Sequence, residues 1–487
     1  MHPRVAAALR WAPLAVGAAF VAWRFWNLED ASFINDEPKY LQMAQDQLRS
    51  GTWATNSGVG SQGFVYGPAQ IWFYRVVQGL FGPRPLTAIA ANCVATTASQ
   101  VGLVLAMSNR KQWTAPGVGL AILGSSPFLF WWSRTAWDFF PYFVAYLAAA
   151  IMVRSPALGW KQCLGLGVLV GLGLDSHPMI AYFALPVGML VLFEHRKRPL
   201  LAVGMGALTA GVAALVAAPW FFALKAAGGA PSTGLQFPTF ERWTRVLFEP
   251  VRMLTSHKVD YLFNESWKEL EAGQPLVASL QAATGLTLAV LALATLAGLY
   301  FAARGAHAGR RRTAQFALAL LVFYPVMLAA SSVTLQVHHS WPLMWIPIFG
   351  CVVAVEEVAE RFPRHAPAAV ALLLAVAAYH FAFIQQWTQF VHREGGNRTL
   401  VLNSTLGEQT RAIAQVCQQP ERTIFLENYT HVLPGSLAYI HATTPACAGK
   451  ALQFCPPGRC PPTTPESRTL LLGYARQQGA ALAVAAR

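Results

Sequence analysis

The sequence predicts a mostly α-helical protein that crosses a membrane many times. Of its 487 residues, 55% are apolar and only 12% are charged, whereas soluble domains carry roughly 25% charged residues. The mean hydropathy is +0.39. These values exclude a soluble enzyme, a disordered chain and a fibrous repeat, and they favour a polytopic membrane protein.

Apolar stretches long enough to cross a bilayer predict eleven spans. They begin near residues 11, 86, 115, 139, 163, 178, 200, 276, 314, 341 and 367. The first follows Arg4 and Arg10 and lacks a small-residue cleavage site, so we interpret it as a retained helix and not as a signal peptide.

Basic residues occupy alternate loops between these spans. One side holds fifteen of the 36 Lys and Arg residues: Arg4, Arg10, Arg110, Lys111, Arg154, Lys161, Arg196, Lys197, Arg198, Arg304, Arg310, Arg311, Arg312, Arg361 and Arg364. The positive-inside rule then predicts a cytoplasmic N-terminus and, after eleven spans, an extracytoplasmic C-terminus. The alanine-rich, lysine-poor composition favours a bacterial source, so we expect a multi-pass protein of the cell (inner) membrane. This placement explains the net charge of +14 without a nucleic-acid partner.

Three outward segments are too polar to span the membrane: residues 28–85, 223–275 and 388–487. Loops of this length are usually functional. We therefore expect two domains, a transmembrane catalytic domain over 1–387 and a small mixed α/β extracytoplasmic domain over 388–487. In the second domain, we expect a helix over Gly407–Cys417 and strands over Thr423–Glu427 and Leu470–Leu472.

Cysteine placement agrees with an outward C-terminal domain. Cys417, Cys447, Cys455 and Cys460 all lie there, on the side where disulfides persist. Four cysteines allow three connectivities, of which we favour Cys417–Cys447 with a local Cys455–Cys460 bridge. A zinc site is the weaker alternative, because no matching histidine pair accompanies the C-x4-C spacing.

Two adjacent acids, Asp36 and Glu37, closely follow the first span. Pro38 suits the first turn of a helix, so both acids should lie at the N-terminus of a helix along the membrane surface. Asp36 could simply cap this helix while Glu37 favours its dipole. A catalytic role is the stronger interpretation, because a carboxylate pair against a membrane is costly unless it is used.

Three further outward turns carry polar groups. Their candidate residues are Arg134, Asp138, Asp175, His177, His338 and His339. Arg134 and Asp138 have the spacing of an i,i+4 ion pair, and a structural role for them is as well supported as a functional one. His177 alone is readily explained as a satisfied polar residue before a proline. The adjacent imidazoles of His338 and His339 suit phosphate or metal binding.

These residues resemble the motifs of the GT-C glycosyltransferases, in the branch of protein O-mannosyltransferases and aminoarabinose transferases. Asp36-Glu-Pro-Lys-Tyr40 with Ala44 is similar to the Asp-Glu-x-x-Tyr-x-x-x-Ala motif of that family. Ser133 to Asp138 resembles its second polar turn. The resemblance covers about residues 10–390.

Two segments depart from the family pattern. Gly171 to Pro178, followed by Leu185-Pro186, has His177 where relatives have the lysine of Lys-Gly-Pro. His338-His339-Ser-Trp-Pro342 with Pro347 aligns with an Arg-Tyr-x-x-Pro-x-x-Pro turn. Recognition of the donor phosphate is therefore expected to differ from that of the named relatives.

The resemblance implies an inverting transfer of a sugar from a polyprenyl-phosphate donor to a hydroxyl of a glycan, lipid or protein at the outer face. Asp36 and Glu37 would be the catalytic residues, with Asp36 as the general base, and Tyr40, Asp138 and Asp175 are further site candidates. Cationic or hydrogen-bonding groups would neutralise the leaving phosphate: Arg134, His177, His338 and His339. A divalent metal, Mg or Mn, on Asp36 or Glu37 is an alternative, and we expect no other cofactor.

Two other functions fit parts of the sequence. A transporter or lipid flippase would explain many spans, but we find no inverted repeat, and the acids cluster at one face. An O-antigen ligase or polymerase also uses lipid-linked sugars, but it leaves the Asp36-Glu37 segment unexplained.

Segments 28–85 and 223–275 also share aromatic and basic residues: Trp53, Tyr66, Trp72, Tyr74, Arg75, Trp243, Arg245, Arg252, Lys258, Tyr261 and Trp267. Singly, these residues are best explained as interfacial anchors. Together, they predict surface helices that cover the sugar-binding cleft and exclude water.

Overall fold

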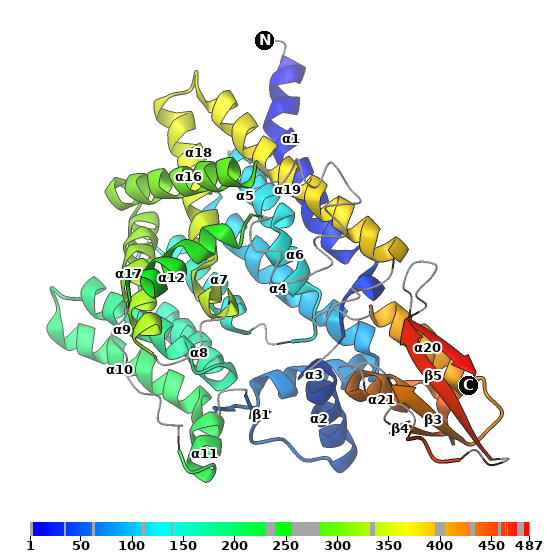
Figure 1. Ribbon diagram of the computed structural model, residues 1–487. Helices are drawn as coiled ribbons and strands as arrows, with labels where there is room; N and C mark the ends of the chain where they lie inside the picture. Colours follow the sequence, from blue (N-terminus) through cyan, green and yellow to red (C-terminus); the bar gives the residue numbers. More distant parts are fainter. Residues whose placement is uncertain are drawn as a thin grey trace.

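The structure is a computed structural model that describes residues 3–33, 36–60, 64–108, 113–137, 140–229, 239–255, 283–331, 337–394, 405–428, 434–455, 459–462, 464, 466–474 and 482–486. Within these ranges, a large helical bundle is joined to a smaller C-terminal α/β unit (Figure 1). The predicted mostly helical class is confirmed.

Each predicted span corresponds to a helix. These are α1 (Pro3–Ala22), α4 (Pro85–Met107), α5 (Thr114–Ser125), α7 (Phe140–Arg154), α8 (Trp160–Ser176), α9 (Ile180–Glu194), α10 (Pro199–Val216), α16 (Thr284–Arg304), α17 (Ala308–Ala330), α18 (Trp345–Arg361) and α19 (Ala366–Glu394). Among the described residues, six helices are long and apolar enough to cross a membrane, or seven if one bent pair counts as a span. Several spans are confirmed, and the number eleven stays a prediction.

The bent pair joins α5 to α6 (Pro127–Ser133) at an angle of 70°. Proline lacks an amide N–H and disfavours a helical conformation in the residue before it. Ser126 accordingly takes an extended conformation, and its side chain accepts a hydrogen bond from the Leu129 amide. The span expected from residue 115 is therefore broken, and its second half ends at the second polar turn.

Small residues let helices in the middle of the bundle approach closely. A Cβ added at Gly117 of α5 would lie 2.4 Å from the Leu14 backbone N in α1. One added at Gly298 of α16 would overlap the carbonyl oxygen of Gly350 in α18. Such contacts are typical of membrane helices, which associate through packing and not through exclusion of water.

The basic ends of the helices are held together by one buried guanidinium. Arg312 at the start of α17 is 3% exposed and pairs with Glu194 at the end of α9. It also donates to the carbonyl oxygen of Ser155 at 2.8 Å and to that of Pro156 at 3.0 Å, in the connection between α7 and α8. Several loops predicted to share one side of the membrane therefore lie together.

The first long outward segment forms α2 (Asp36–Ser50), the hairpin strands β1 (Gly58–Val59) and β2 (Val65–Tyr66), and α3 (Ala69–Phe81). The predicted helix after Asp36 is confirmed. The second contributes α11 (Ala218–Ala226) and α12 (Phe240–Arg252), whereas residues 230–238 and 256–282 lie outside the described part. The predicted cover over the sugar therefore stays a prediction, and Lys258, Tyr261 and Trp267 fall outside the description.

The C-terminal unit contains α20 (Leu406–Cys417), β3 (Thr423–Asn428), α21 (Pro434–Thr443), β4 (Ala451–Cys455), β5 (Ser467–Tyr474) and β6 (Leu482–Ala486). Its sheet has the order β4-β3-β5-β6, with β3 parallel to β4 and β5, and β5 antiparallel to β6. The expected helix and two strands are present, and the disulfides are Cys417–Cys447 and Cys455–Cys460, as favoured. The proposed domain boundary at 387/388 falls within α19 and stays a prediction.

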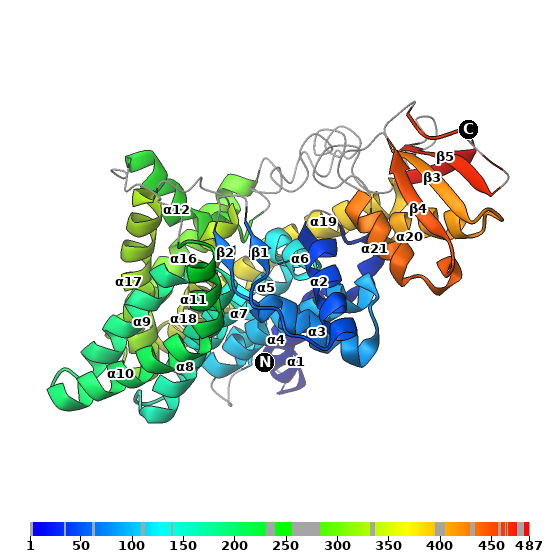
Figure 2. The same ribbon diagram turned by 90° about the horizontal axis from the view of Figure 1, so that it is seen from below.

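This unit docks beside α2 and α3 (Figure 2). The Leu406 amide donates to the Ala31 carbonyl at 2.8 Å, and Gln409 donates to the Phe33 carbonyl at 3.1 Å. Tyr439 of α21 accepts a hydrogen bond from Gln78 of α3 at 3.0 Å. The C-terminal unit therefore holds Ala31 and Phe33, which shortly precede Asp36 in the chain.

Candidate active site

The acid pair begins α2, and its two members have different surroundings. Glu37 is 2% exposed, and its Oε1 accepts a hydrogen bond from the Ala136 amide at 2.7 Å. Asp36 is partly exposed and makes no hydrogen bond or ion pair with another described residue. Glu37 thus ties α2 to the second polar turn, while Asp36 keeps its carboxylate accessible. Tyr40, one turn further along α2, is buried.

Arg134 ends α6 and is 2% exposed. It donates to the carbonyl oxygen of Asn27, and its guanidinium lies 4.8 Å from the Phe130 ring centroid. Burial lowers the pKa of Arg134 to about 10, so the group stays charged at neutral pH. Among the described residues, it has no acid within ion-pair distance and its Nε has no hydrogen-bond partner, so this buried cation can accept an anion.

The start of α3 connects the second polar turn to the third. The Ala69 amide donates to Asp175 Oδ2 at 2.6 Å, so Asp175 caps α3 from another part of the chain. A Cβ added at Gly67 would lie 2.4 Å from Asp175 Oδ1, which explains why a residue without a side chain stands there. Gln70 and Tyr74 both donate to the Trp137 carbonyl oxygen.

His177 follows α8 and brings the hairpin and the fourth polar turn together. Its ring stacks on Tyr66, with centroids 5.3 Å apart, and lies 6.3 Å from the His339 ring. Its Nδ1 accepts a hydrogen bond from the Met179 amide at 3.3 Å. Burial lowers the pKa of His177 to about 4, so the ring is neutral at pH 7, and its proton resides on Nε2.

The neutral state of His177 predicts an acid-sensitive stability. The unfolded chain protonates this histidine below about pH 6.5, whereas the folded protein does so only near pH 4. Over that window the unfolded state binds more protons, so the free energy of unfolding falls as the pH is lowered. When the pH is lowered from 7.5 to 5 in detergent, the unfolding temperature should fall less for His177→Gln than for the wild-type protein. An equal loss in this variant, or the same relief from exposed His365→Gln, would contradict the assignment.

The fourth polar turn lies in a 3-10 helix over Val337–Leu343. His339 is 5% exposed, and its carbonyl oxygen accepts a hydrogen bond from Tyr324 at 2.6 Å. Asp138 and the side chain of His338 lie outside the described part of the chain. The described contacts of Glu37, Asp175 and His177 therefore join the first outward segment to the three polar turns.

The acid pair does not assemble a metal site with the described residues. Mg and Mn favour about six oxygen ligands, yet in the described chain no third acid, histidine or cysteine gathers with Asp36 and Glu37. Glu37 is also already used by the Ala136 amide. We therefore derive no step through a metal. Among the described residues, Cys417, His441 and Cys447 lie close enough together to hold a metal ion. The two cysteines form a disulfide with each other, however.

The structure adds residues that the sequence did not single out for the site. Gln70 carries no motif signal, and Tyr66 and Tyr74 appeared only among many interfacial aromatics. Their contacts with Trp137 and His177 depend on how the hairpin and α3 fold back over the bundle. The amphipathic pattern of α3 shows which face of the helix is buried, but it does not identify Trp137 as the residue that this face contacts.

Comparison with curated proteins finds sequence relatives for part of the chain. It is 30% identical over 214 residues to the undecaprenyl phosphate-alpha-4-amino-4-deoxy-L-arabinose arabinosyl transferase of Pseudomonas paraeruginosa, covering 40% of this chain and 37% of that protein. It is 28% identical over 240 residues to a protein of the same name, numbered 1, from Pseudomonas fluorescens, covering 46% and 41%. The matched part is thus under half of each relative's length. No family model matches the chain.

Two solved structures show a distant likeness. ArnT from Cupriavidus metallidurans, bound to undecaprenyl phosphate, has 15% sequence identity and a TM-score of 0.46, covering 90% of this chain and 89% of that one. The archaeal oligosaccharyltransferase AglB from Archaeoglobus fulgidus has 11% identity and a TM-score of 0.48, covering 91% and 64%.

The resemblance to GT-C glycosyltransferases is confirmed by the sequence relatives. Over the matched stretch, the chain is related to the aminoarabinose transferases named for undecaprenyl phosphate.

Proposed function

We propose that this protein is an inverting membrane glycosyltransferase that takes a sugar from a polyprenyl-phosphate donor. The hydrogen bond between Glu37 and the Ala136 amide carries the proposal, because it joins the acid pair to the turn that holds Arg134. The names of the sequence relatives support undecaprenyl phosphate as the lipid and an amino sugar as the first donor to test. The acceptor is a hydroxyl of a glycan, lipid or protein.

In this mechanism, the acceptor oxygen attacks the anomeric carbon of the donor. Asp36 takes the hydroxyl proton as the new carbon–oxygen bond forms, since an unassisted hydroxyl is a poor nucleophile. The bond between the anomeric carbon and the phosphate oxygen breaks, and polyprenyl phosphate leaves with the electron pair. Attack opposite the leaving group inverts the anomeric centre.

The leaving phosphate requires positive charge or hydrogen-bond donors. Arg134 supplies a cation that forms no ion pair within the described chain, although the Asp30 carboxylate is near enough to favour its charged state. His177 would contribute a neutral Nε2–H donor, because its Nδ1 is occupied by the Met179 amide. His339 and His338 would complete the phosphate site. Glu37 and Asp175 act as positioning residues, since their carboxylates hold backbone amides.

The orientation follows from charge. We propose that the end of the bundle at Arg312, where basic loops meet, faces the cytoplasm, and that the acid pair and C-terminal unit face outward. The protein would then reside in the inner membrane with its N-terminus inside and its C-terminus outside, which agrees with the two disulfides of the C-terminal unit.

A turnover assay with purified protein tests the proposal. Undecaprenyl phosphate-4-amino-4-deoxy-L-arabinose with a labelled sugar is incubated with envelope extract, and label is followed into lipid, glycan and protein fractions. We expect transfer to one fraction with release of undecaprenyl phosphate. Movement of labelled lipid across proteoliposomes without any sugar transfer, for this donor and for other undecaprenyl-phosphate sugars, would favour the flippase alternative and overturn the proposal.

A further inference from the structure

Two cavities adjoin at the basic end of the bundle, away from the candidate active site. One is a chamber of about 660 Å³ lined by the ends of α4, α7, α16 and α18 and the start of α17. The other is a groove of about 710 Å³ along α7 and α8. Ala106 and Arg154 line both, so the chamber and the groove meet at the Arg154 side chain.

The groove has the form of a lipid-chain site. Its walls are apolar along most of its length: Leu147, Ala150, Ile151, Leu164, Val168 and Leu169. Arg154 and Lys161 lie at one end of it. Trp160 is 58% exposed, and Lys161 Nζ lies 5.5 Å from its ring centroid, a pairing typical of the membrane boundary. An acyl chain in the groove would bring its phosphate to these cations.

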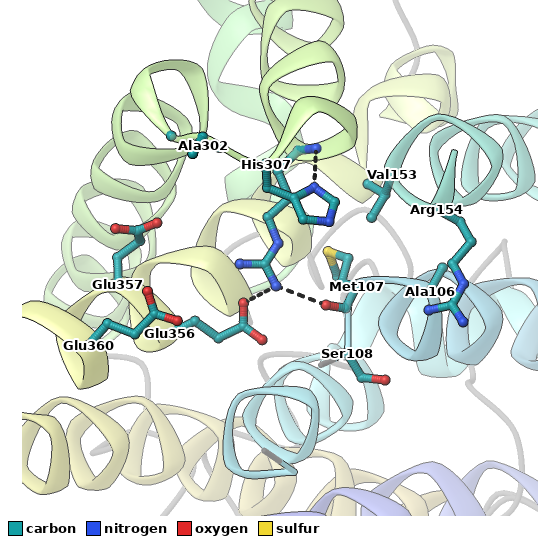
Figure 3. Close-up of a pocket in the computed structure, with 13 residues that line it drawn as sticks. Ala106, Met107, Ser108, Val153, Arg154, Ala302, His307, Glu356, Glu357 and Glu360 are labelled. Atoms are coloured by element: carbon teal, nitrogen blue, oxygen red, sulfur yellow. Dashed lines mark hydrogen bonds and ion pairs between the residues drawn. The ribbon is translucent and has the colours of Figure 1, made fainter. Parts of the chain in front are cut away.

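The chamber carries charges that are mostly paired. Arg310 forms an ion pair with Glu356 and donates to the Met107 carbonyl oxygen at 3.0 Å (Figure 3). Glu357 pairs with Arg361 at 2.8 Å. His307 Nδ1 accepts from the Arg310 amide at 3.2 Å, and burial together with the Arg310 guanidinium holds the pKa of His307 below its ordinary value.

The charges that remain have opposite signs on opposite walls. Within the described chain, Arg154, Lys161 and Glu360 have no ion-pair partner. Glu356 is 3% exposed, and its Oε1 has no hydrogen-bond partner. Figure 3 shows Arg154 on one side of the chamber and the three glutamates on the other. A ligand that satisfies both walls carries an anion near Arg154 and a cation that reaches the glutamates.

We propose that the chamber and groove bind a phospholipid with a primary amine, such as phosphatidylethanolamine. Its phosphate pairs with Arg154 and Lys161, its ammonium group meets Glu360 and Glu356 Oε1, and one acyl chain fills the groove. The three donor hydrogens of the ammonium group suit carboxylate acceptors. This site is independent of the proposed glycosyl transfer, since it uses none of the residues of the candidate active site.

Lipid titration of the delipidated, detergent-purified protein tests the proposal, with binding measured by native mass spectrometry. Palmitoyl-oleoyl phosphatidylethanolamine should bind about three- to tenfold more tightly than phosphatidylcholine with the same chains, and Glu360→Gln should remove this preference. Arg154→Gln should weaken both lipids about tenfold. Leu164→Trp, at a 39% exposed groove residue, should weaken both by obstructing the chain.

Arg196→Gln is the matched control, because Arg196 lies at the same end and lines neither cavity; it should leave binding unchanged. Equal binding of phosphatidylethanolamine and phosphatidylcholine would overturn the proposal, as would tighter binding of phosphatidylglycerol that Glu360→Gln does not alter. Equal binding of chain-free glycerophosphoethanolamine would show that the groove holds no acyl chain. Each result is obtained without a sugar donor, so it is separate from the turnover assay.

Discussion

Asp36→Asn is expected to lower the rate of sugar transfer by about 10²–10⁴-fold, the usual contribution of a general base. Asparagine keeps the size of the side chain, but its amide cannot take the hydroxyl proton. Because Asp36 is partly exposed and has no described partner, the fold should be preserved. The measurement is initial-rate transfer at saturating donor, with thermal unfolding of the same preparation.

Two variants separate this role from its alternatives. Glu37→Gln should lower the unfolding temperature, because it weakens the hydrogen bond from the buried Ala136 amide. Asp46→Asn, on the exposed face of the same helix, should change neither rate nor stability. Near-normal transfer by Asp36→Asn would show that the base lies elsewhere. Asp138 would be the next candidate if Glu37→Gln also stayed active.

Arg134→Gln is expected to weaken binding of the donor by about 10- to 100-fold, because hydrogen bonds to charged groups contribute about 1.5–3 kcal/mol. Glutamine is uncharged, and its side chain is too short to replace the terminal guanidinium nitrogen that donates to the Asn27 carbonyl oxygen. The KM for the donor should therefore increase by a much larger factor than the KM for the acceptor. Titration with undecaprenyl phosphate, the leaving group itself, gives the same affinity without turnover.

Arg75→Gln is the control for charge at this end of the protein. Arg75 is partly exposed on the first outward segment, where its guanidinium lies 3.7 Å from the Trp53 ring centroid and donates to the Thr52 carbonyl oxygen. Its replacement should leave the donor KM unchanged. The assignment of the phosphate site is wrong if Arg134→Gln raises the KM of donor and acceptor equally. It is also wrong if Arg134→Gln prevents folding and His339→Gln leaves the donor affinity unchanged.

Local patterns predicted much of this structure. Hydropathy located the helices of the bundle, and Asp36-Glu37-Pro38 located the start of α2, since both depend on residues close in sequence. The bend at Ser126-Pro127 has an equally local cause, but its angle of 70° depends on how α6 packs. In the C-terminal unit, strands over Thr423–Glu427 and Leu470–Leu472 were expected, whereas the parallel pairing of β3 with β5 required the fold.

The roles within the site depended on long-range contacts. Glu37 and Ala136 are 99 residues apart, and Ala69 and Asp175 are 106 apart. From the sequence, Glu37 and Asp36 were both catalytic candidates, with Asp36 as the general base, and Asp175 was one more outward polar residue. Hydrophobicity and charge specify which segments enter the membrane, because each segment partitions largely on its own composition. The packing of those segments against one another decides which carboxylate holds a backbone amide and which stays available for a proton.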